Sequence, residues 1–112
     1  MNEIIINGEI YIKKDNDKLS EYVIVRTYSA GVFAGYFASR NGREVILTNA
    51  RRLWYWEGAS SLSQLAIDGT CLPDKCKFPC EVSRIELLDA IEILNTSDKA
   101  KKSINEVPVW SQ

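Results

Sequence analysis

The amino-acid sequence predicts an α+β protein, mainly an antiparallel β-sheet with two short helices, on the basis of three observations. Runs of β-branched and aromatic residues recur along the chain, and these residue types are enriched in strands. Asn-Gly dipeptides separate two pairs of such runs, as in tight β-hairpins. Two serine-led segments place apolar residues at helical spacing. With 112 residues, 46% of them hydrophobic, we expect a single domain over residues 1–112.

Hairpin patterns predict the strands of the first half of the chain. Apolar residues 4–6 and 10–12 flank Asn7-Gly8, a dipeptide that accepts positive φ at both central positions of a type I′ turn. Three further strands are predicted over residues 22–28, 32–39 and 43–48. Asn41-Gly42 supplies the turn between the last two, so a three-stranded antiparallel meander is expected at the centre of the chain.

Extended structure is predicted to continue over residues 51–56 and to give way to a short helix. Ser60 or Ser61 can cap this helix, and Gly69 ends it. The next segment, residues 70–80, contains two prolines and all three cysteines, which is the composition of an irregular loop.

The last third of the chain predicts more strand and a second helix. Residues 85–94 break strict alternation, so we expect either two short strands or one bulged strand. Thr96 or Ser97 is predicted to cap the final helix, which turns Ala100 and Ile104 inward. The apolar segment that follows, residues 107–110, is expected to pack back onto the protein.

Charge and composition exclude several function classes. Fourteen Lys+Arg against 15 Asp+Glu leave a formal net charge of −1, and the chain has no histidine. The commonest general base and the triads that depend on it are therefore missing, and we do not expect an enzyme. The sequence also lacks a signal-peptide pattern and any run of ~20 apolar residues, so a cytoplasmic protein without membrane association is expected.

The most unusual segment sets two guanidinium groups beside three large aromatic side chains. Aromatic faces stack on nucleobases, and a planar guanidinium binds phosphate oxygens in pairs, so this is the side-chain set of a nucleotide site. The candidate ligand contacts in this segment are Asn49, Arg51, Arg52, Trp54, Tyr55 and Trp56.

Strand alternation would place Arg52, Trp54 and Trp56 on one face of this segment. Arg52 could then clamp a phosphate beside two stacking rings. The alternative is that the aromatic residues fill the core of a small sheet, with the arginines solvated or paired with acids. The sequence leaves both interpretations open.

A second candidate cluster lies at the end of the predicted strand 22–28. Arg26, Tyr28 and Ser29 combine a cation with hydroxyl groups, and Ala30-Gly31 follows. A turn of this composition can present backbone N–H groups to an anion. Serine and glycine at a strand end are equally typical of ordinary turns.

The cysteines form an odd set, Cys71, Cys76 and Cys80. Structural zinc takes four ligands, and without histidine the fourth would have to be a carboxylate such as Asp74 or Glu81. The C-x4-C-x3-C spacing argues against such a site, so no metal and no cofactor are expected. We predict reduced thiols that pack as small hydrophobic side chains.

Three stretches of the sequence carry a family resemblance: VIVRTYSAGVFAGYFASRNGREVILTNARRLWYWEGASSLSQLA, CKFPCEV and KAKKSINEVPVW. Over about residues 20–110 the chain resembles a family of small uncharacterised proteins of tailed bacteriophages and prophages. ARRLWYWEGASSLSQLA is the most specific part. The resemblance implies a phage accessory protein in the host cytoplasm and does not imply a particular chemistry.

The phage setting and the Arg and aromatic cluster together lead to a functional hypothesis. The protein would bind and sequester a nucleotide immune second messenger, of the cyclic oligonucleotide or ADP-ribose type, without turnover. The alternative is a protein-interaction module that inhibits a host or defence enzyme through its aromatic and Arg surface. The near-zero net charge disfavours nucleic acid as the partner. A homo-oligomer is expected, because a small sheet has edges to cover and pockets between protomers are deep.

Overall fold

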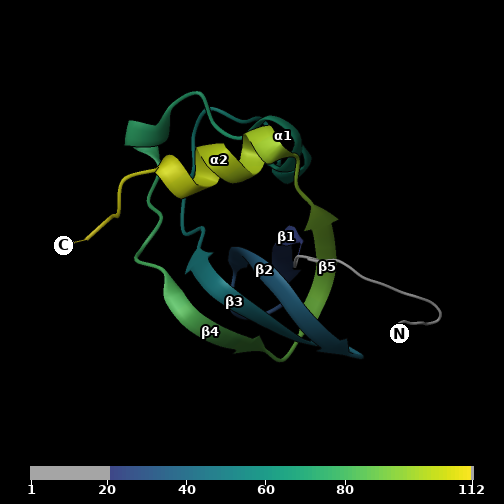
Figure 1. The fold of residues 1–112 in the computed structure, drawn as a ribbon. Coiled ribbons are helices and arrows are strands. Elements are labelled where there is room, and N and C mark those ends of the chain that lie inside the picture. The colour runs from purple at the N-terminus through teal and green to yellow at the C-terminus, as the bar shows by residue number, and fades with distance from the viewer. Residues whose placement is uncertain (1–20, 112) are drawn as a thin grey trace.

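The computed structural model describes residues 21–111 (Figure 1). Within them lie five strands, two α-helices and one 3₁₀ turn. In chain order these are β1 (Tyr22–Thr27), β2 (Val32–Asn41), β3 (Glu44–Arg52), α1 (Leu62–Asp68), the 3₁₀ turn Pro73–Lys75, β4 (Val82–Leu87), β5 (Ala90–Asn95) and α2 (Asp98–Glu106). The hairpin predicted around Asn7-Gly8 lies outside the described residues.

Five antiparallel strands form one sheet in the order β4-β3-β2-β1-β5, which confirms the predicted α+β class. The two edge strands, β4 and β5, are consecutive in the chain and are joined only by Leu88-Asp89. The Ala90 N–H donates to the Arg43 carbonyl at 3.0 Å and ties the start of β5 to the β2–β3 turn. The sheet therefore curves strongly and brings its two edges together at the β4–β5 turn (Figure 1).

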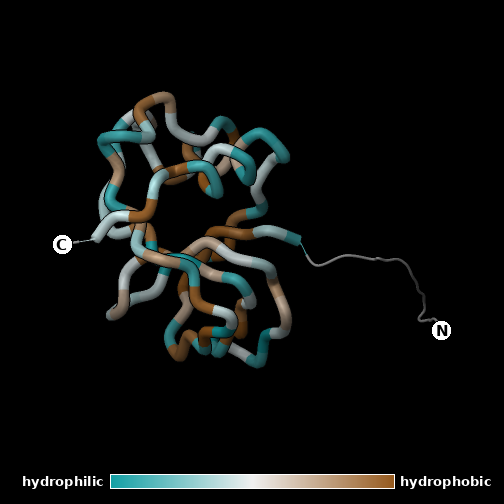
Figure 2. The backbone as a smooth tube through the Cα atoms, turned by 60° about the vertical axis from the view of Figure 1, so that its left-hand side comes forward, coloured by the Kyte–Doolittle hydropathy of each residue, from teal (hydrophilic) through white to brown (hydrophobic). Residues whose placement is uncertain are grey.

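A hydrophobic core lies on each face of this sheet. The first core joins sheet residues such as Ile24 to Leu65 of α1 and Ile104 of α2. The second core lies on the opposite face and includes Val25 and Phe33. Hydrophobic segments are accordingly found in both the helical half and the sheet half of the molecule (Figure 2). Because β1 contributes to both cores, its first four residues, 22–25, are all buried and apolar and do not alternate.

The central meander is confirmed, but its β2–β3 turn lies one residue further along than predicted. Asn41 pairs with Glu44, so the central turn residues are Gly42 and Arg43. Gly42 has a φ of 63°. Glycine with positive φ at the first central position is the pattern of a type II′ turn. Both strands are also longer than predicted: β2 ends at Asn41 and β3 at Arg52, beyond the predicted ends at residues 39 and 48.

Replacing Gly42 with valine is expected to lower the free energy of unfolding by about 1–2 kcal/mol, because a β-branched residue resists positive φ. Asparagine adopts this conformation more readily, so Gly42→Asn is the matched control and should cost less. Urea denaturation of the three proteins measures both changes. Equal stability of the valine and asparagine variants would show that positive φ at this position does not set the cost.

The helices and the C-terminal segment largely follow the prediction. Ser61 and Ser97, one from each predicted pair, are the N-caps, and their hydroxyl oxygens accept backbone N–H groups of the first turn. The segment 85–94 falls into two strands, the first of the two alternatives. The tail docks back as expected, since the Trp110 N–H donates to the Phe78 carbonyl at 3.0 Å. No helix in residues 21–111 has the length and apolar content needed to cross a membrane.

Candidate functional site

Three members of the predicted aromatic and Arg cluster, Asn49, Arg51 and Arg52, lie in β3, and the other three follow the strand. Asn49 is an extra residue of β3 opposite β2 and has a φ of 46°, so β3 contains a β-bulge here. The strand ends at Arg52. Beyond it only Tyr55 pairs again within the described cluster, through an isolated bridge with Lys77. The regular strand therefore ends at Arg52, and the extended structure predicted over residues 51–56 continues only in part, through the Leu53 N–H that donates to the Val32 carbonyl at 2.8 Å and the bridge at Tyr55.

Arg51 faces the first core and is only 5% exposed. Its guanidinium donates four hydrogen bonds to backbone carbonyl oxygens. These run from Nε to Pro79 at 3.1 Å, from Nη1 to Ile104 at 2.9 Å and Val107 at 3.0 Å, and from Nη2 to Phe78 at 2.7 Å. Burial lowers the pKa of the Arg51 guanidinium from its ordinary value. All three guanidinium nitrogens are engaged inside the protein, so Arg51 is not available to the ligand it was predicted to contact.

Arg52 points to the opposite face of β3 and is exposed. Its guanidinium carbon lies 4.8 Å from the centre of the Phe33 ring, in a cation–π contact. Two depressions of about 250 Å³ and 290 Å³ flank this contact. They share Phe33, Arg52 and Ile85, and we name them together the Arg52 groove. Its centre is the exposed edge of the second core, with one cation set on an apolar floor.

The second predicted cluster is divided between two places. Ser29 and Arg52 line the same depression, so the structure brings these two candidates together. The Ser29 hydroxyl and backbone N–H, the latter at 3.1 Å, both donate to the Asp89 carboxylate. The predicted anion-binding turn thus holds a carboxylate of the protein itself. Tyr28 is 83% exposed beside this turn, whereas Arg26 lies apart, with its Nε 2.9 Å from a Glu92 oxygen.

The three aromatic residues of the cluster have different surroundings. Trp54 is 64% exposed and lies two residues after Arg52, beyond the end of β3. Trp56 is half-buried against the first core, so the prediction that it shares a face with Arg52 and Trp54 is wrong. The core-filling interpretation therefore holds for Trp56 and not for Trp54. Asn49 is exposed at the bulge.

Tyr55 belongs to a separate surface. The ammonium of Lys77 lies 5.7 Å from the ring centres of both Tyr55 and Trp110, and we name these three residues the aromatic patch. The Tyr55 hydroxyl donates to a Glu57 carboxylate oxygen at 2.6 Å. This hydrogen bond raises the pKa of Tyr55. No local sequence pattern indicates the patch, because two of its members come from distant segments.

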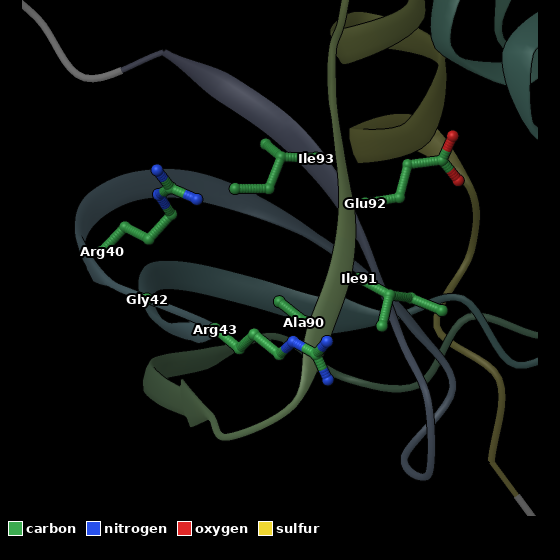
Figure 3. A pocket seen from close by; sticks show the side chains of 7 residues that line it. All are labelled: Arg40, Gly42, Arg43, Ala90, Ile91, Glu92 and Ile93. Atoms are coloured by element: carbon green, nitrogen blue, oxygen red, sulfur yellow. The ribbon is translucent and has the colours of Figure 1, made fainter.

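A cleft lined by two arginines is not predicted from the sequence. Arg40 and Arg43 lie on either side of Gly42 in the β2–β3 hairpin and, with residues of β5, line a cleft of about 420 Å³ (Figure 3). Ile93 of β5 points toward Arg40 in this view. The one sequence signal that could have indicated this cleft is Arg-Asn-Gly-Arg, in which two arginines flank a tight turn. The position of β5 that completes the cleft follows only from the long-range pairing of β5 with β1.

The three thiols differ in exposure. Cys76 is buried in the first core, as predicted for a small hydrophobic side chain. Cys71 and Cys80 are exposed, so that prediction is wrong for them. Within residues 21–111 no three His, Cys, Asp or Glu side chains gather closely enough to hold a metal ion.

Comparison with known proteins identifies a family. A family model described as "Domain of unknown function (DUF6948)" matches residues 20–104, which is most of the chain. Neither a curated protein nor a solved structure matches the chain.

Proposed function

Because the chain belongs to this family, whose function is unknown, we propose its role from the chemistry of the Arg52 groove. The protein acts as a phage accessory protein in the host cytoplasm and sequesters a nucleotide immune second messenger, of the cyclic oligonucleotide or ADP-ribose type, without turnover. One observation carries the proposal. The exposed Arg52 guanidinium packs on the Phe33 ring between two depressions, and Trp54, two residues along the chain, is exposed as well.

The groove offers the two interactions that a nucleotide needs. The planar guanidinium of Arg52 can donate paired, charge-assisted hydrogen bonds to phosphate oxygens. The Phe33 ring holds one face of that guanidinium, which limits the side-chain freedom lost when a ligand binds. Trp54 presents an exposed ring two residues away, and base stacking on such a ring contributes about 1–3 kcal/mol.

The groups of the groove favour capture over chemistry. Ser29 donates its hydroxyl to Asp89, so this lining hydroxyl and this lining carboxylate are already engaged with each other. The chain has no histidine, so the groove lacks the commonest general base. Arg52 and the apolar floor bind and orient a phosphate without accepting a proton. We therefore propose that the bound nucleotide is retained intact.

A homo-oligomer completes the proposal. Each depression, at about 250 Å³ and 290 Å³, is smaller than the ~300–1,000 Å³ pockets that enclose small ligands. A second copy closing over the groove would bury more of the ligand and cover exposed apolar residues at its rim. Leu88 and Val82 are such residues. Light scattering with and without nucleotide tests this part.

Replacing Arg52 with alanine is expected to weaken nucleotide binding about ten- to a hundredfold, the loss of one charge-assisted contact worth about 1.5–3 kcal/mol. Calorimetry with cyclic di- and trinucleotides, cyclic mononucleotides and ADP-ribose derivatives measures the change, and chromatography of the released ligand tests its integrity. Arg84→Ala is the matched control, because Arg84 is an exposed β4 arginine outside the groove lining. Equal loss in both variants, or a degraded ligand, would contradict the proposal.

A second candidate function is supported by the aromatic patch. Tyr55, Lys77 and Trp110 form a surface whose rings flank a cation, and Val109 beside them is 61% exposed. Tyrosine and tryptophan are enriched among the residues that dominate the binding energy of protein interfaces. We therefore propose, as the alternative, a module that binds and inhibits a host or defence enzyme. An absence of binding throughout the nucleotide panel, with capture of one host protein that Tyr55→Ala abolishes, would favour it.

A further inference from the structure

We propose that the cleft between the β2–β3 turn and β5 is a second, independent binding site, for a small organic anion with a phosphate or carboxylate head and an apolar body. Its lining is Arg40, Gly42, Arg43 and the β5 residues Ala90, Ile91, Glu92 and Ile93. None of these residues lines the Arg52 groove, which lies on the other side of Leu88-Asp89. The inference therefore does not depend on the proposed function.

The two arginines are held in position by the fold of the hairpin. Arg43 is the second central residue of a two-residue turn, and its carbonyl accepts the Ala90 N–H at 3.0 Å. Arg40 pairs with Val45 one ladder position from the turn. The tight turn and the hydrogen bond from Ala90 to Arg43 therefore fix the backbones of both arginines relative to β5. Two guanidinium groups carried on backbones held in this way can each donate to an anionic head that lies between them.

The charge inside the cleft is positive. Glu92 is the single acid among the described lining residues. Its carboxylate accepts a hydrogen bond from Arg26 Nε at 2.9 Å, which engages it with another cation. In Figure 3 the Glu92 side chain extends from the other side of the β5 ribbon, away from Arg40 and Arg43. The two lining arginines therefore leave an excess of positive charge that an anion would balance.

The apolar part of the ligand is inferred from β5. Ile93 is 37% exposed, and Figure 3 shows its side chain directed toward Arg40. Ala90 lies on the same side of the strand in this view. An inorganic phosphate would meet the arginines but leave this apolar wall in water. An aromatic or branched aliphatic body attached to the head would cover it, and the volume of about 420 Å³ accommodates both parts.

The test uses the full chain and two probes, inorganic phosphate and phenyl phosphate, titrated by NMR at physiological ionic strength. We expect both to shift the backbone signals of residues 40–43 and 90–93, with phenyl phosphate binding more tightly than inorganic phosphate. Arg40→Gln and Arg43→Gln should each weaken binding about tenfold, and Ile93→Ser should weaken only phenyl phosphate. Arg43→Gln changes a turn residue and could disturb the turn itself. Arg40→Gln changes a residue of β2, so it tests the loss of the cation with the turn residues unchanged.

Two controls separate this site from the Arg52 groove and from nonspecific attraction to surface cations. Arg52→Gln removes the cation of the Arg52 groove and should leave phenyl phosphate binding unchanged, so failure of the proposed function and failure of this site are distinguishable. Arg84→Gln removes an exposed arginine elsewhere and should also have no effect. The inference is overturned if phenyl phosphate shifts no signal in the cleft, or if Arg84→Gln weakens binding as much as Arg40→Gln.

Discussion

Replacing Arg51 with methionine is expected to lower the free energy of unfolding by about 3–5 kcal/mol, as when one partner of a buried polar network is removed. The variant keeps the apolar stem of the side chain but removes all four hydrogen bonds to carbonyl oxygens. The Pro79 and Val107 oxygens would lose the donor that the structure shows for them, whereas the Phe78 and Ile104 oxygens would keep only the backbone N–H groups of Trp110 and Val107. Equilibrium urea denaturation, followed by tryptophan fluorescence, measures the change.

The expected effect is large because the acceptors come from separate segments of the chain. Phe78 and Pro79 belong to the loop before β4, and Ile104 and Val107 lie at the end of α2. The last carbonyls of a helix have no partner within the helix, and a cation there is also favoured by the helix dipole. Arg51 thus caps α2 from the sheet and joins three parts of the chain.

Two further variants make the result specific. Arg51→Lys should recover only part of the stability, because an ammonium group cannot reach the four acceptors that the planar guanidinium spans. Arg52→Met, one residue along the same strand, should change the free energy of unfolding by less than about 1 kcal/mol, since Arg52 is exposed. A methionine variant at position 51 as stable as the one at position 52 would contradict the role of this network.

The features predicted correctly from the sequence depend on local interactions. Ser61 and Ser97 cap their helices through hydrogen bonds that stay within one helical turn. The strand β1 is recognised from its own β-branched and aromatic residues. Each of these signals lies within a few consecutive residues. The sequence therefore located the start of each helix to within one residue.

The features missed depend on contacts between distant segments. The β2–β3 turn forms at Gly42-Arg43 and not at Asn41-Gly42, and the observed register contains a bulge in each strand. The composition of the turn does not specify these bulges. Gly35 permits a close approach of β2 to β3, because a Cβ there would lie 2.7 Å from that of Ala50.

The candidate site shows the same division. Arg51 and Arg52 are adjacent and chemically identical, yet one is buried among carbonyl oxygens and the other is exposed on the Phe33 ring. Alternation correctly predicted that they face opposite sides. Alternation could not indicate which face of β3 is covered by the loop before β4 and by the end of α2. The proximity of Arg40 and Arg43 to β5 likewise becomes visible only when the sheet curves.

Replacing Gly69 with alanine is expected to lower the free energy of unfolding by about 2–4 kcal/mol, from backbone strain and overpacking together. Gly69 has φ 74° and ψ −156°, a region that is essentially restricted to glycine. A Cβ at this position would overlap the Cβ and hydroxyl of Ser103 on α2. The variant would therefore push α1 and α2 apart, and it should weaken the hydrogen bond from the Thr70 N–H to the Ser103 hydroxyl, now 3.0 Å long.

Gly31→Ala separates the two causes of that loss. Gly31 also has a positive φ, of 95°, but no atom lies within 4 Å of a Cβ built there. It should therefore show the backbone cost alone, about 1–2 kcal/mol. Urea denaturation of both variants gives the difference, which measures how closely the end of α1 packs against α2. If Gly69→Ala proves no less stable than Gly31→Ala, overlap with Ser103 does not add to the cost of a side chain at Gly69.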